Sequence, residues 1–447
     1  MDENPAARRR SQARRGAAQR GRARDGAERA GGWTGTEFEV TVGPVAHGGH
    51  CVARHEGRVV FVRHSLPGER VVVRVTEDRH PAFCRADAIE VLEASPERVE
   101  RPCPYSGPGR CGGCDWQHVT PTEQRRLKAA VVREQLARLA GIDLDVVVEE
   151  LPGGPLRWRS RARFAVDRSG AAGLRRHRSH DVVVLDDCPI TVESAAAAGL
   201  QRRWPGAGAV DVSVDSTGAV TTTRLDRRGQ PTGSRVVRPG GSLPEEPAGR
   251  AERRAGGRDW EVEGTGFWQV HPAAADALVA AVAGFAQVRS GETVLDLYAG
   301  AGLFGGALAP AVGPEGRVVC VESDEAACAA ADANLGDLPQ AEVWQGDVDA
   351  EGLAGLLGEL GGAPDVVVLD PPRAGAGPAV SRLLAGTGAR AVVYVACDPA
   401  ALARDVAAFT AAGYRLAGVR GFDAFPMTSH VECVALLEPD PARAAAS

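Results

Sequence analysis

Short apolar runs alternate with alanine-rich stretches of helical spacing over residues 263–440. Five of these runs are rich in valine and leucine: TVLDL, RVVCVE, AEVWQ, DVVVLD and AVVYVA. Apolar runs separated by helical stretches are typical of parallel strands joined by crossover helices. Two further runs, YRLAGVRGF and HVECVALLE, predict a final antiparallel pair. The pattern therefore predicts a doubly wound α/β sheet for this region.

The chain before residue 263 has a different pattern. Residues 34–95 are β-branched runs broken by Gly and Pro, which predicts a small OB-like barrel of about five strands. Residues 96–262 predict a small central α+β domain, in which residues 121–141 have helical spacing and a glycine stop. Within it, residues 225–258 are rich in Gly, Pro and Arg and are interpreted as a long loop or insertion. Residues 441–447 are a short tail.

Charge is distributed unevenly along the 447 residues, whose formal net charge is −6. Residues 1–33 are polar and arginine-rich, which predicts a disordered basic arm. Lys128 is the only lysine, so nearly every cation is a guanidinium, a group that binds phosphates bidentately and stacks on bases. No apolar run reaches transmembrane length and no secretory signal is present, which predicts a cytoplasmic protein without a membrane partner. Nothing implies a protein partner, so a monomer is expected.

Arginine recurs in two neighbouring runs of the central region. LRWRSRARFAV places an arginine at every second position, and on a strand these side chains would share one face. After a glycine-containing turn, LRRHRSHDVVVL adds three more and predicts a hairpin. A charged run is usually only a solvated face, but the scarcity of acids here favours a surface that binds RNA phosphates. The predicted RNA-binding residues are Arg157, Arg159, Arg161, Arg163, Arg175, Arg176 and Arg178.

Four of the ten cysteines have the spacing of a metal site. Cys103, Cys111 and Cys114 form C-x7-C-x2-C, and Cys188 follows the arginine hairpin. Four thiolates can bind either Zn²⁺ or a [4Fe-4S] cluster, and spacing alone does not separate the two. A three-plus-one layout with adjacent prolines favours the cluster over zinc and over free thiols. No redox step is required of it, so its predicted role is structural.

A glycine-rich loop, DLYAGAG, follows the first predicted strand of the sheet and leads into a helix. Gly300 and Gly302 allow the backbone to pass close to a ligand. Glu322, Asp347 and Asp370 end the next predicted strands, at the sheet edge where such folds bind nucleosides. A dinucleotide enzyme is the rival interpretation. The offset of Gly305 from that pattern and the DPPR motif favour S-adenosylmethionine instead.

Three pieces predict a catalytic site at the same edge of the sheet. They are DPPR at Asp370–Arg373, Cys397 after the fifth strand, and Glu432 at the start of the last strand. Carbon 5 of uracil is a weak nucleophile until a thiolate adds to carbon 6, and a base must later remove the carbon 5 proton. Cys397 suits the first role and Glu432 the second, while Arg373 can stabilise charge on the uracil oxygen.

These motifs carry a family resemblance. The barrel resembles a TRAM domain, and the sheet resembles the class I (Rossmann-like) methyltransferases. Residues 36–440 resemble the RNA (uracil-5-)-methyltransferases, in the branch with a TRAM domain and an iron–sulfur centre that modifies 23S rRNA. The resemblance implies a covalent nucleophile at Cys397, a proton acceptor at Glu432 and a [4Fe-4S] cluster on the four cysteines. It also implies S-adenosylmethionine contacts from Gln269, Tyr298, Glu322, Asp347 and Asp370.

The sequence departs from this family at several positions and leaves more than one function open. Leu303 and His271 stand where asparagine is common, and Ala396 and Asp398 replace residues of an SCNP motif. Ribosomal RNA is favoured over transfer RNA because the barrel and the cluster accompany the rRNA-modifying branch. An RNA cytosine-5 methyltransferase would need a second cysteine in place of DPPR. A catalytically silent RNA-binding or ribosome-assembly factor is the non-enzymatic possibility.

Overall fold

The structure is a computed structural model that describes residues 32–238, 246–247, 249–264 and 266–444. The predicted basic arm therefore lies outside the described residues, apart from its last two. The chain divides into two units, Met1–Arg98 and Val99–Ser447. Among the described residues, no helix combines the length and apolarity needed to cross a membrane.

The first unit contains a five-stranded sheet in the order β1-β4-β5-β3-β2, as the sequence predicts. The strands are β1 (Glu37–Thr41), β2 (Cys51–His55), β3 (Arg58–Arg63), β4 (Arg70–His80) and β5 (Phe83–Glu93). Valines that alternate inward along β3 and β4 contribute Val60, Val62, Val71 and Val73 to its core. The β-branched runs that predict the barrel from the sequence are these strands.

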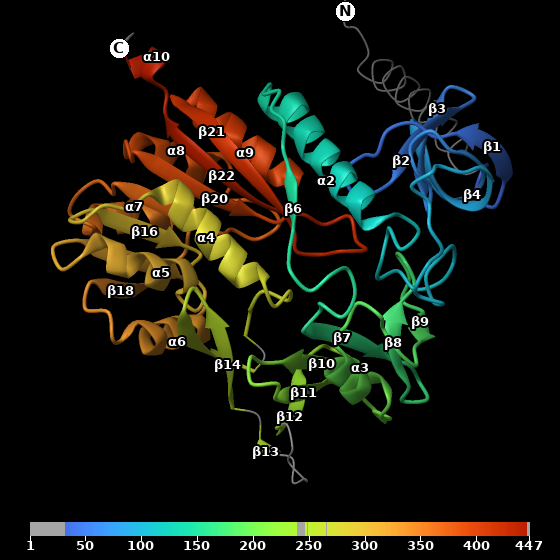
Figure 1. The fold of residues 1–447 in the computed structure, drawn as a ribbon, viewed down its shortest axis with the longest axis horizontal. Helices are drawn as coiled ribbons and strands as arrows, with labels where there is room; N and C mark the ends of the chain where they lie inside the picture. The colour runs from blue at the N-terminus through green and yellow to red at the C-terminus, as the bar shows by residue number, and fades with distance from the viewer. Residues whose placement is uncertain (1–31, 239–245, 248, 265, 445–447) are drawn as a thin grey trace, which may run out of the picture. The chain divides into compact units, whose positions relative to one another are not determined.

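The second unit is built on an eight-stranded sheet in the order β18-β17-β16-β19-β20-β22-β21-β6 (Figure 1). The predicted strands are present as β16 (Thr293–Leu297), β17 (Arg317–Glu322), β18 (Ala341–Gln345), β19 (Val366–Leu369), β20 (Ala391–Ala396), β21 (Tyr414–Asp423) and β22 (Glu432–Pro439). Strands β16 to β20 are parallel, and β22 is antiparallel to β20 and β21. The doubly wound sheet with a final antiparallel pair is therefore confirmed.

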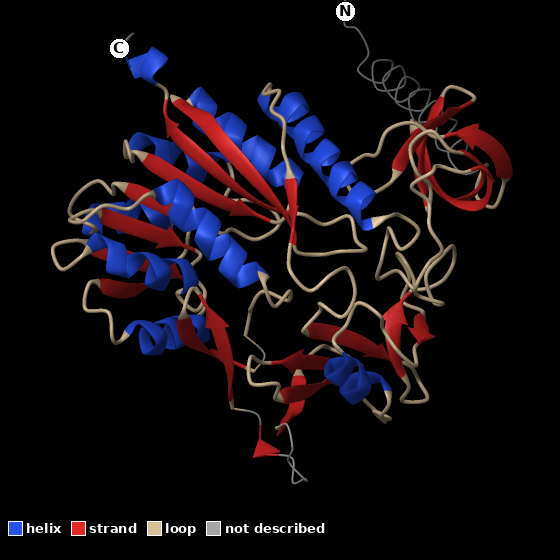
Figure 2. Ribbon diagram, in the orientation of Figure 1, coloured by secondary structure: helices blue, strands red, loops and turns tan. Residues whose placement is uncertain are grey.

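Helices cover both faces of this sheet (Figure 2). One face packs against α4 (Ala274–Ala286), α5 (Leu303–Val312) and α6 (Glu325–Leu335). The other packs against α7 (Ala350–Glu359), α8 (Pro378–Gly386) and α9 (Pro399–Ala411). Because both faces are covered, the central strands are continuous apolar runs rather than alternating ones.

The segment at residues 121–150 corrects the predicted domain boundary. Its helix is present as α2 (Pro121–Gln135), continued by the π-helix η1 (Leu136–Ala140), and β6 (Val148–Glu150) pairs with β21. Val132 and Leu136 lie in the same core as β20 and α9. The sequence pattern places this segment in the central domain, but it packs on the eight-stranded sheet, because its apolar face is buried in that core.

The central region contains a seven-stranded sheet in the order β13-β12-β11-β10-β7-β8-β9. Its elements are β7 (Arg161–Val166), β8 (Ala172–Arg175), β9 (Val182–Val184), α3 (Glu193–Leu200), β10 (Ala209–Val214), β11 (Val220–Leu225), β12 (Pro231–Val237) and β13 (Glu246–Pro247). The apolar residues of α3 and β10 pack around Phe164, which is fully buried. The predicted hairpin in the arginine region is present, because β7 and β8 are antiparallel.

The segment at residues 225–258, predicted as a long loop or insertion, is not a continuous loop. It contains β12 and β14 (Arg250–Ala255), and β14 forms a separate two-stranded sheet with β15 (Arg258–Glu263). Along RAERRA the second, fourth and sixth residues are buried, two of them alanines and one an arginine. Alanine is only weakly apolar and arginine is polar, so the sequence does not show that every second residue of this strand is buried. After the main sheet, residues 441–444 form a short terminal helix, α10.

Candidate active site

Two carboxylates hold the glycine-rich loop between β16 and α5. Gly300 and Gly302 have φ of 55° and 87°, in the left-handed region that favours glycine. Glu322 accepts a hydrogen bond from the Gly300 N–H at 2.9 Å, and buried Asp296 accepts one from the Gly305 N–H at 2.7 Å. Burial raises the pKa of Asp296 to about 7. Asp296 is not among the residues predicted from the sequence, although it stands inside the DLYAGAG motif.

The predicted cofactor acids lie at one edge of the sheet. Glu322 ends β17, Asp347 follows β18 by two residues, and Asp370 directly follows β19. Since these strands run parallel to β16 in the same sheet, their carboxyl ends meet around the glycine loop. The Tyr298 hydroxyl donates to the carbonyl of Val348 at 2.9 Å, which ties this loop to the one that carries Asp347. Gln269 is buried in the segment before α4.

The predicted catalytic residues converge beside this site. Cys397 follows β20 and Glu432 begins β22, and the pairing of Ala396 with Cys433 brings these two strand ends together. Burial, followed by the charges of Glu432 and Asp370, raises the pKa of Cys397 to about 11, while Arg373 acts in the opposite direction. Burial, followed by the charge of Asp370, raises the pKa of Glu432 well above its ordinary value. The resting site therefore favours a neutral thiol and a neutral carboxyl.

A small pocket lies over the DPPR loop. Its lining includes Pro371, Arg373, Tyr394 and Cys397. Glu432 is not among the residues that line it; this side chain is buried and interacts with Cys397 through charge. Cys397 and Arg373 thus line the same small depression, whereas Glu432 does not.

Asp405 on α9 fixes the position of the DPPR loop. Its carboxylate accepts hydrogen bonds from the N–H of Ala376 at 2.8 Å, the N–H of Gly377 at 3.1 Å and the hydroxyl of Tyr394 at 2.6 Å. A Cβ at Gly375 would lie 2.6 Å from the same carboxylate, so glycine is needed there. Asp405 was missed at the level of sequence. The sequence does place it among Leu402, Val406 and Phe409, on the apolar face of the helix, and this position could have indicated a buried carboxylate.

Replacing Asp405 with alanine is expected to lower both stability and turnover. Three donors would lose a buried acceptor, which predicts a loss of about 2–4 kcal/mol in the free energy of unfolding. The rate of methyl transfer should fall as well, because the loop that carries Arg373 loses its attachment. Urea unfolding and initial rates measure the two effects. Arg404→Ala, at an exposed position of the same helix, is the control and should change neither.

The four predicted metal ligands lie near one another. Burial, with a further contribution from the charge of Cys188, raises the pKa of Cys103, Cys111 and Cys114. Gln117 donates to the sulfur of Cys114 at 3.3 Å, and Cys111 forms a β-bridge with Arg176 of the arginine hairpin. All ten cysteines are free thiols. Among the described residues, however, no group of three or more His, Cys, Asp or Glu side chains is arranged to hold a metal ion.

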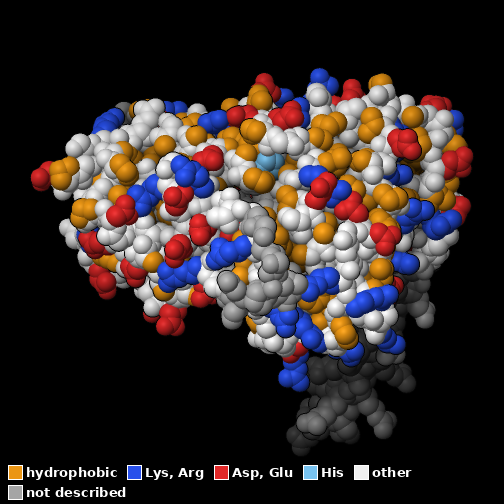
Figure 3. Space-filling model, turned by 60° about the horizontal axis from the view of Figure 1, so that its bottom comes forward, with side chains coloured by type: hydrophobic (Ala, Val, Ile, Leu, Met, Phe, Trp, Pro, Cys, Tyr) orange, Lys and Arg blue, Asp and Glu red, His pale blue; other side chains and the backbone are white. Residues whose placement is uncertain are grey.

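The predicted row of four arginines on one strand face is wrong. Only Arg161 and Arg163 lie on β7, and Arg157, with φ of 56°, precedes it together with Arg159. Arg157 pairs with Asp187 at 2.7 Å and Arg163 with Asp211 at 2.6 Å. These acids come from other parts of the chain, so the local composition could not reveal them. On the face drawn in Figure 3, basic and acidic side chains are likewise interspersed.

The second arginine group lies at the end of β8 and in the turn that follows it. Arg175 ends β8, and Arg176 and Arg178 lie in the β8–β9 turn. All three are exposed. They lie beside the cysteine loop, because the Gly112 N–H donates to the carbonyl of Arg175 at 3.0 Å.

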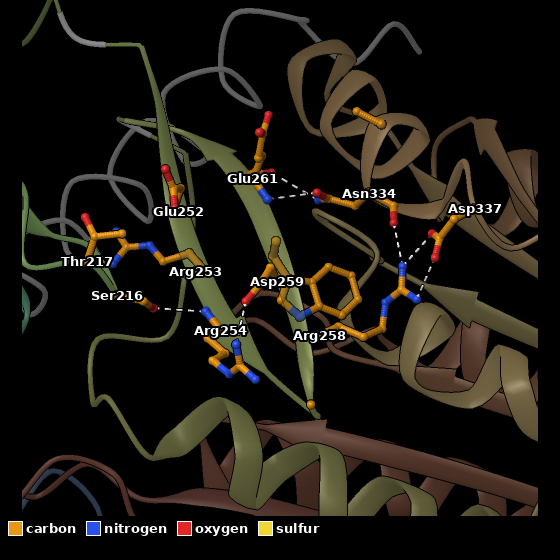
Figure 4. A pocket seen from close by; sticks show the side chains of 13 residues that line it. Ser216, Thr217, Glu252, Arg253, Arg254, Arg258, Asp259, Glu261, Asn334 and Asp337 are labelled. Atoms are coloured by element: carbon orange, nitrogen blue, oxygen red, sulfur yellow. Dashed lines mark hydrogen bonds and ion pairs between the residues drawn. The ribbon is translucent and has the colours of Figure 1, made fainter.

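A larger cavity, of about 850 Å³, lies at the β14–β15 hairpin (Figure 4). Cys397 is not among the residues that line it. Two of its arginines already have carboxylate partners: Arg258 pairs with Asp337 at 2.7 Å and Arg254 with Asp259 at 3.1 Å. The side chain of Asn334, also in its wall, donates to the carbonyl of Ala301 in the glycine loop at 3.1 Å. This wall therefore supports the loop, and its paired charges do not indicate a site for an anion.

The sheet order, the glycine loop and the acids at the strand ends together define the fold of the class I methyltransferases. A solved structure with this architecture is the tRNA (uracil-54, C5)-methyltransferase of Pyrococcus abyssi, at a TM-score of 0.64 and 23% identity over 89% of this chain and 99% of that one. Residues 34–89 match the model of the TRAM domain, and residues 363–440 match that of the tRNA (Uracil-5-)-methyltransferase family.

Two relatives place the chain more narrowly. An uncharacterized RNA methyltransferase of Streptomyces coelicolor is 48% identical over 91% of this chain and 93% of its own length. The 23S rRNA (uracil(1939)-C(5))-methyltransferase RlmD of Pseudomonas entomophila is 33% identical over 88% of this chain and 92% of its own length. The chain belongs to the RNA (uracil-5-)-methyltransferase family and is an RNA methyltransferase with an N-terminal TRAM domain.

Proposed function

We propose that this protein methylates carbon 5 of a uridine in 23S rRNA, using S-adenosylmethionine as the methyl donor. The meeting of Cys397 with Glu432, Arg373 and Asp370 at the ends of three neighbouring strands is the observation that carries the proposal. A methyltransferase acting on an exocyclic amine needs no thiol at this position. The methylation of 23S rRNA by the relative in Pseudomonas entomophila supports that RNA as the substrate here.

The geometry supports a covalent route. The Cys397 thiol and the Glu432 carboxyl first release their protons to solvent. The Cys397 sulfur then bonds to carbon 6 of the uracil, which places negative charge on carbon 5 and the carbonyl oxygen. Arg373, which lowers the pKa of this thiol, also stabilises that charge. Carbon 5 then takes the methyl group, and the electrons of the broken bond stay on the sulfur of the methyl donor. Glu432, as carboxylate, removes the carbon 5 proton, and the bond between carbon 6 and the Cys397 sulfur breaks to release 5-methyluridine and the thiolate.

The cofactor site fits a nucleoside with a charged amino-acid tail. We propose that Glu322 binds the ribose hydroxyls, that Asp347 binds the adenine amino group, and that Asp370, Gln269 and Tyr298 contact the rest of the molecule. The hydrogen bond from Gly300 to Glu322 and the bond from Tyr298 to the loop of Asp347 support this assignment. When bound, S-adenosylmethionine supplies an electrophilic methyl group.

The test is methyl transfer from labelled S-adenosylmethionine to unmodified 23S rRNA and, separately, to unmodified tRNA. Mass mapping of the nucleosides identifies the product and its position. We expect 5-methyluridine in 23S rRNA only. 5-Methyluridine in tRNA alone would make tRNA the substrate in place of 23S rRNA. Methylated cytosine, or no product on either RNA, would reject the proposed reaction.

We also propose that the four cysteines hold a [4Fe-4S] cluster with a structural role. The donor set is suitable, since four free thiols interact by charge and two of their sulfurs accept N–H hydrogen bonds. When bound, the cluster would join residues 103–114 to the segment that carries Cys188 and to the arginine hairpin.

Protein purified without oxygen is expected to contain about four iron atoms per chain and to absorb broadly in the visible range. Cys188→Ser should lose both signals and unfold at a lower temperature. Cys84→Ala, in the barrel, is the control and should retain the iron. Stoichiometric zinc without iron in the wild type would replace the cluster with a zinc site.

A further inference from the structure

The loop at residues 424–431 joins β21 to β22 and ends at Glu432. Its most unusual backbone is at Met427, a non-glycine residue with φ of 67°. Side chains rarely adopt this region, so surrounding contacts have to hold it. Within the loop, Thr428 bonds to the carbonyl of Phe425 through both its N–H, at 3.2 Å, and its hydroxyl, at 2.8 Å. Two segments far away in the sequence supply further attachments.

Helix α2 supplies the first attachment. Gln124 is fully buried; its side-chain oxygen accepts from the Met427 N–H at 2.7 Å, and its nitrogen donates to the Met427 sulfur at 3.3 Å. One turn later is Lys128, the only lysine of the chain, which is also fully buried. It forms an ion pair with Asp423, the last residue of β21, and donates to the carbonyl of Phe425 at 3.0 Å.

The segment after Cys114 supplies the second attachment. The N–H groups of Asp115 and Trp116 donate to the carbonyl of Met427 at 3.1 and 3.0 Å. The Asp115 carboxylate accepts from both the N–H and the hydroxyl of Ser429, at 3.1 and 3.0 Å. The residue next to a predicted cysteine ligand is thus bonded to the loop three residues before Glu432.

Cys397 is held by different elements. It lies between β20, in the middle of the sheet, and α9, whose N-terminus is capped by the side chain of Asp398 at 2.8 Å. The bonds that Gln124, Lys128 and Asp115 make with the loop and the strand before it all go to residues 423–429. These bonds therefore hold the loop that leads to the general base.

We propose that Asp115, Gln124 and Lys128 are positioning residues that fix Glu432 for removal of the carbon 5 proton. The inference rests on the proposed function and assigns these three residues to one step of it. It also connects the cysteine segment to the loop that carries Glu432, through the hydrogen bonds of Asp115 and Trp116. Loosening the loop should leave the covalent adduct between Cys397 and the uracil free to form and should slow its release.

The test is a single-turnover reaction of the full-length enzyme, in excess, with labelled 23S rRNA. Gel electrophoresis in detergent follows the covalent protein–RNA adduct, and nucleoside analysis follows free 5-methyluridine. For Gln124→Leu and Asp115→Ala we expect adduct formation near the wild-type rate and release slowed about 10-fold to 100-fold, the scale of a misplaced catalytic group. Asp115→Asn keeps an oxygen acceptor for Ser429 and should restore release.

For Lys128→Met we expect the same slowing of release, and Arg133→Met is its matched control. Arg133 lies on the same helix, but its ion pairs are with Asp143 and Asp145, in the chain after the helix. The control should leave both rates unchanged, and thermal unfolding shows whether each variant is folded. Equal slowing of both steps in folded Gln124→Leu and Asp115→Ala, or slowing of neither, would overturn the positioning role. A wild type that forms no adduct and no 5-methyluridine would overturn the proposed function and this inference with it.

Discussion

Replacing Cys397 with alanine is expected to abolish the formation of 5-methyluridine, lowering the turnover rate by about 10⁴-fold or more. Without the thiolate no bond forms to carbon 6, and carbon 5 of the uracil is too weak a nucleophile to take the methyl group. No covalent protein–RNA adduct should appear under any condition. Binding of S-adenosylmethionine should remain, because the glycine loop and its acids lie on other strands.

Cys433→Ala is the control for this experiment. Cys433 is also a buried cysteine and pairs with Ala396 next to the nucleophile. It follows Glu432 on β22, so its side chain points to the opposite face of the sheet. The control should lose some stability and keep the reaction. Substantial product from Cys397→Ala would contradict the covalent mechanism.

Replacing Glu432 with glutamine is expected to separate methylation from release. The amide cannot accept the carbon 5 proton, so the methylated adduct should accumulate while the turnover rate falls about 10²-fold to 10⁴-fold. The adduct should survive denaturation in detergent and contain both the RNA and the labelled methyl group. Glu438→Gln, near the far end of the same strand, should show neither effect.

The pH dependence of the wild type follows from the raised pKa of Glu432. Proton removal needs the ionised carboxylate, so the rate of release should rise with pH and fall as the carboxyl becomes protonated. Stability should change in the opposite direction. Above the ordinary glutamate pKa the folded chain keeps a proton that the unfolded chain releases, so stability decreases as pH rises through that range. Glu432→Gln removes the part of this dependence that Glu432 causes, while Asp296 and Asp370, whose pKa burial also raises, keep theirs. Thermal unfolding at several pH values measures the difference, and a variant with the full wild-type pH dependence would contradict it.

The sequence by itself determined the strands of the main sheet and the edge at which the chemistry lies. Strands β16, β17, β19 and β20 are mostly apolar runs because both of their faces are buried, and such runs are visible without a structure. Glu322, Asp370 and Cys397 lie directly at strand ends or one residue beyond them, so the topology alone brings them together. The barrel was visible through its short β-branched runs, which Gly and Pro separate.

The tertiary structure decided the contacts between distant segments. The sequence could not show that Arg157 and Arg163 pair with Asp187 and Asp211, because an ion pair depends on which strands become neighbours. Strand β14 could not be predicted from the sequence because its buried residues are two alanines and an arginine. The burial of that arginine depends on its neighbours in the fold.

The same limit applies to the residues that hold the site. Asp405, Gln124 and Lys128 are polar side chains on helix faces that become buried, and each has partners that the fold brings in from another segment. Local pattern determines which apolar residues are buried and at which strand end a side chain lies. Only the tertiary structure determines which buried polar groups form hydrogen bonds with each other, because these bonds depend on atomic positions and not on sequence spacing.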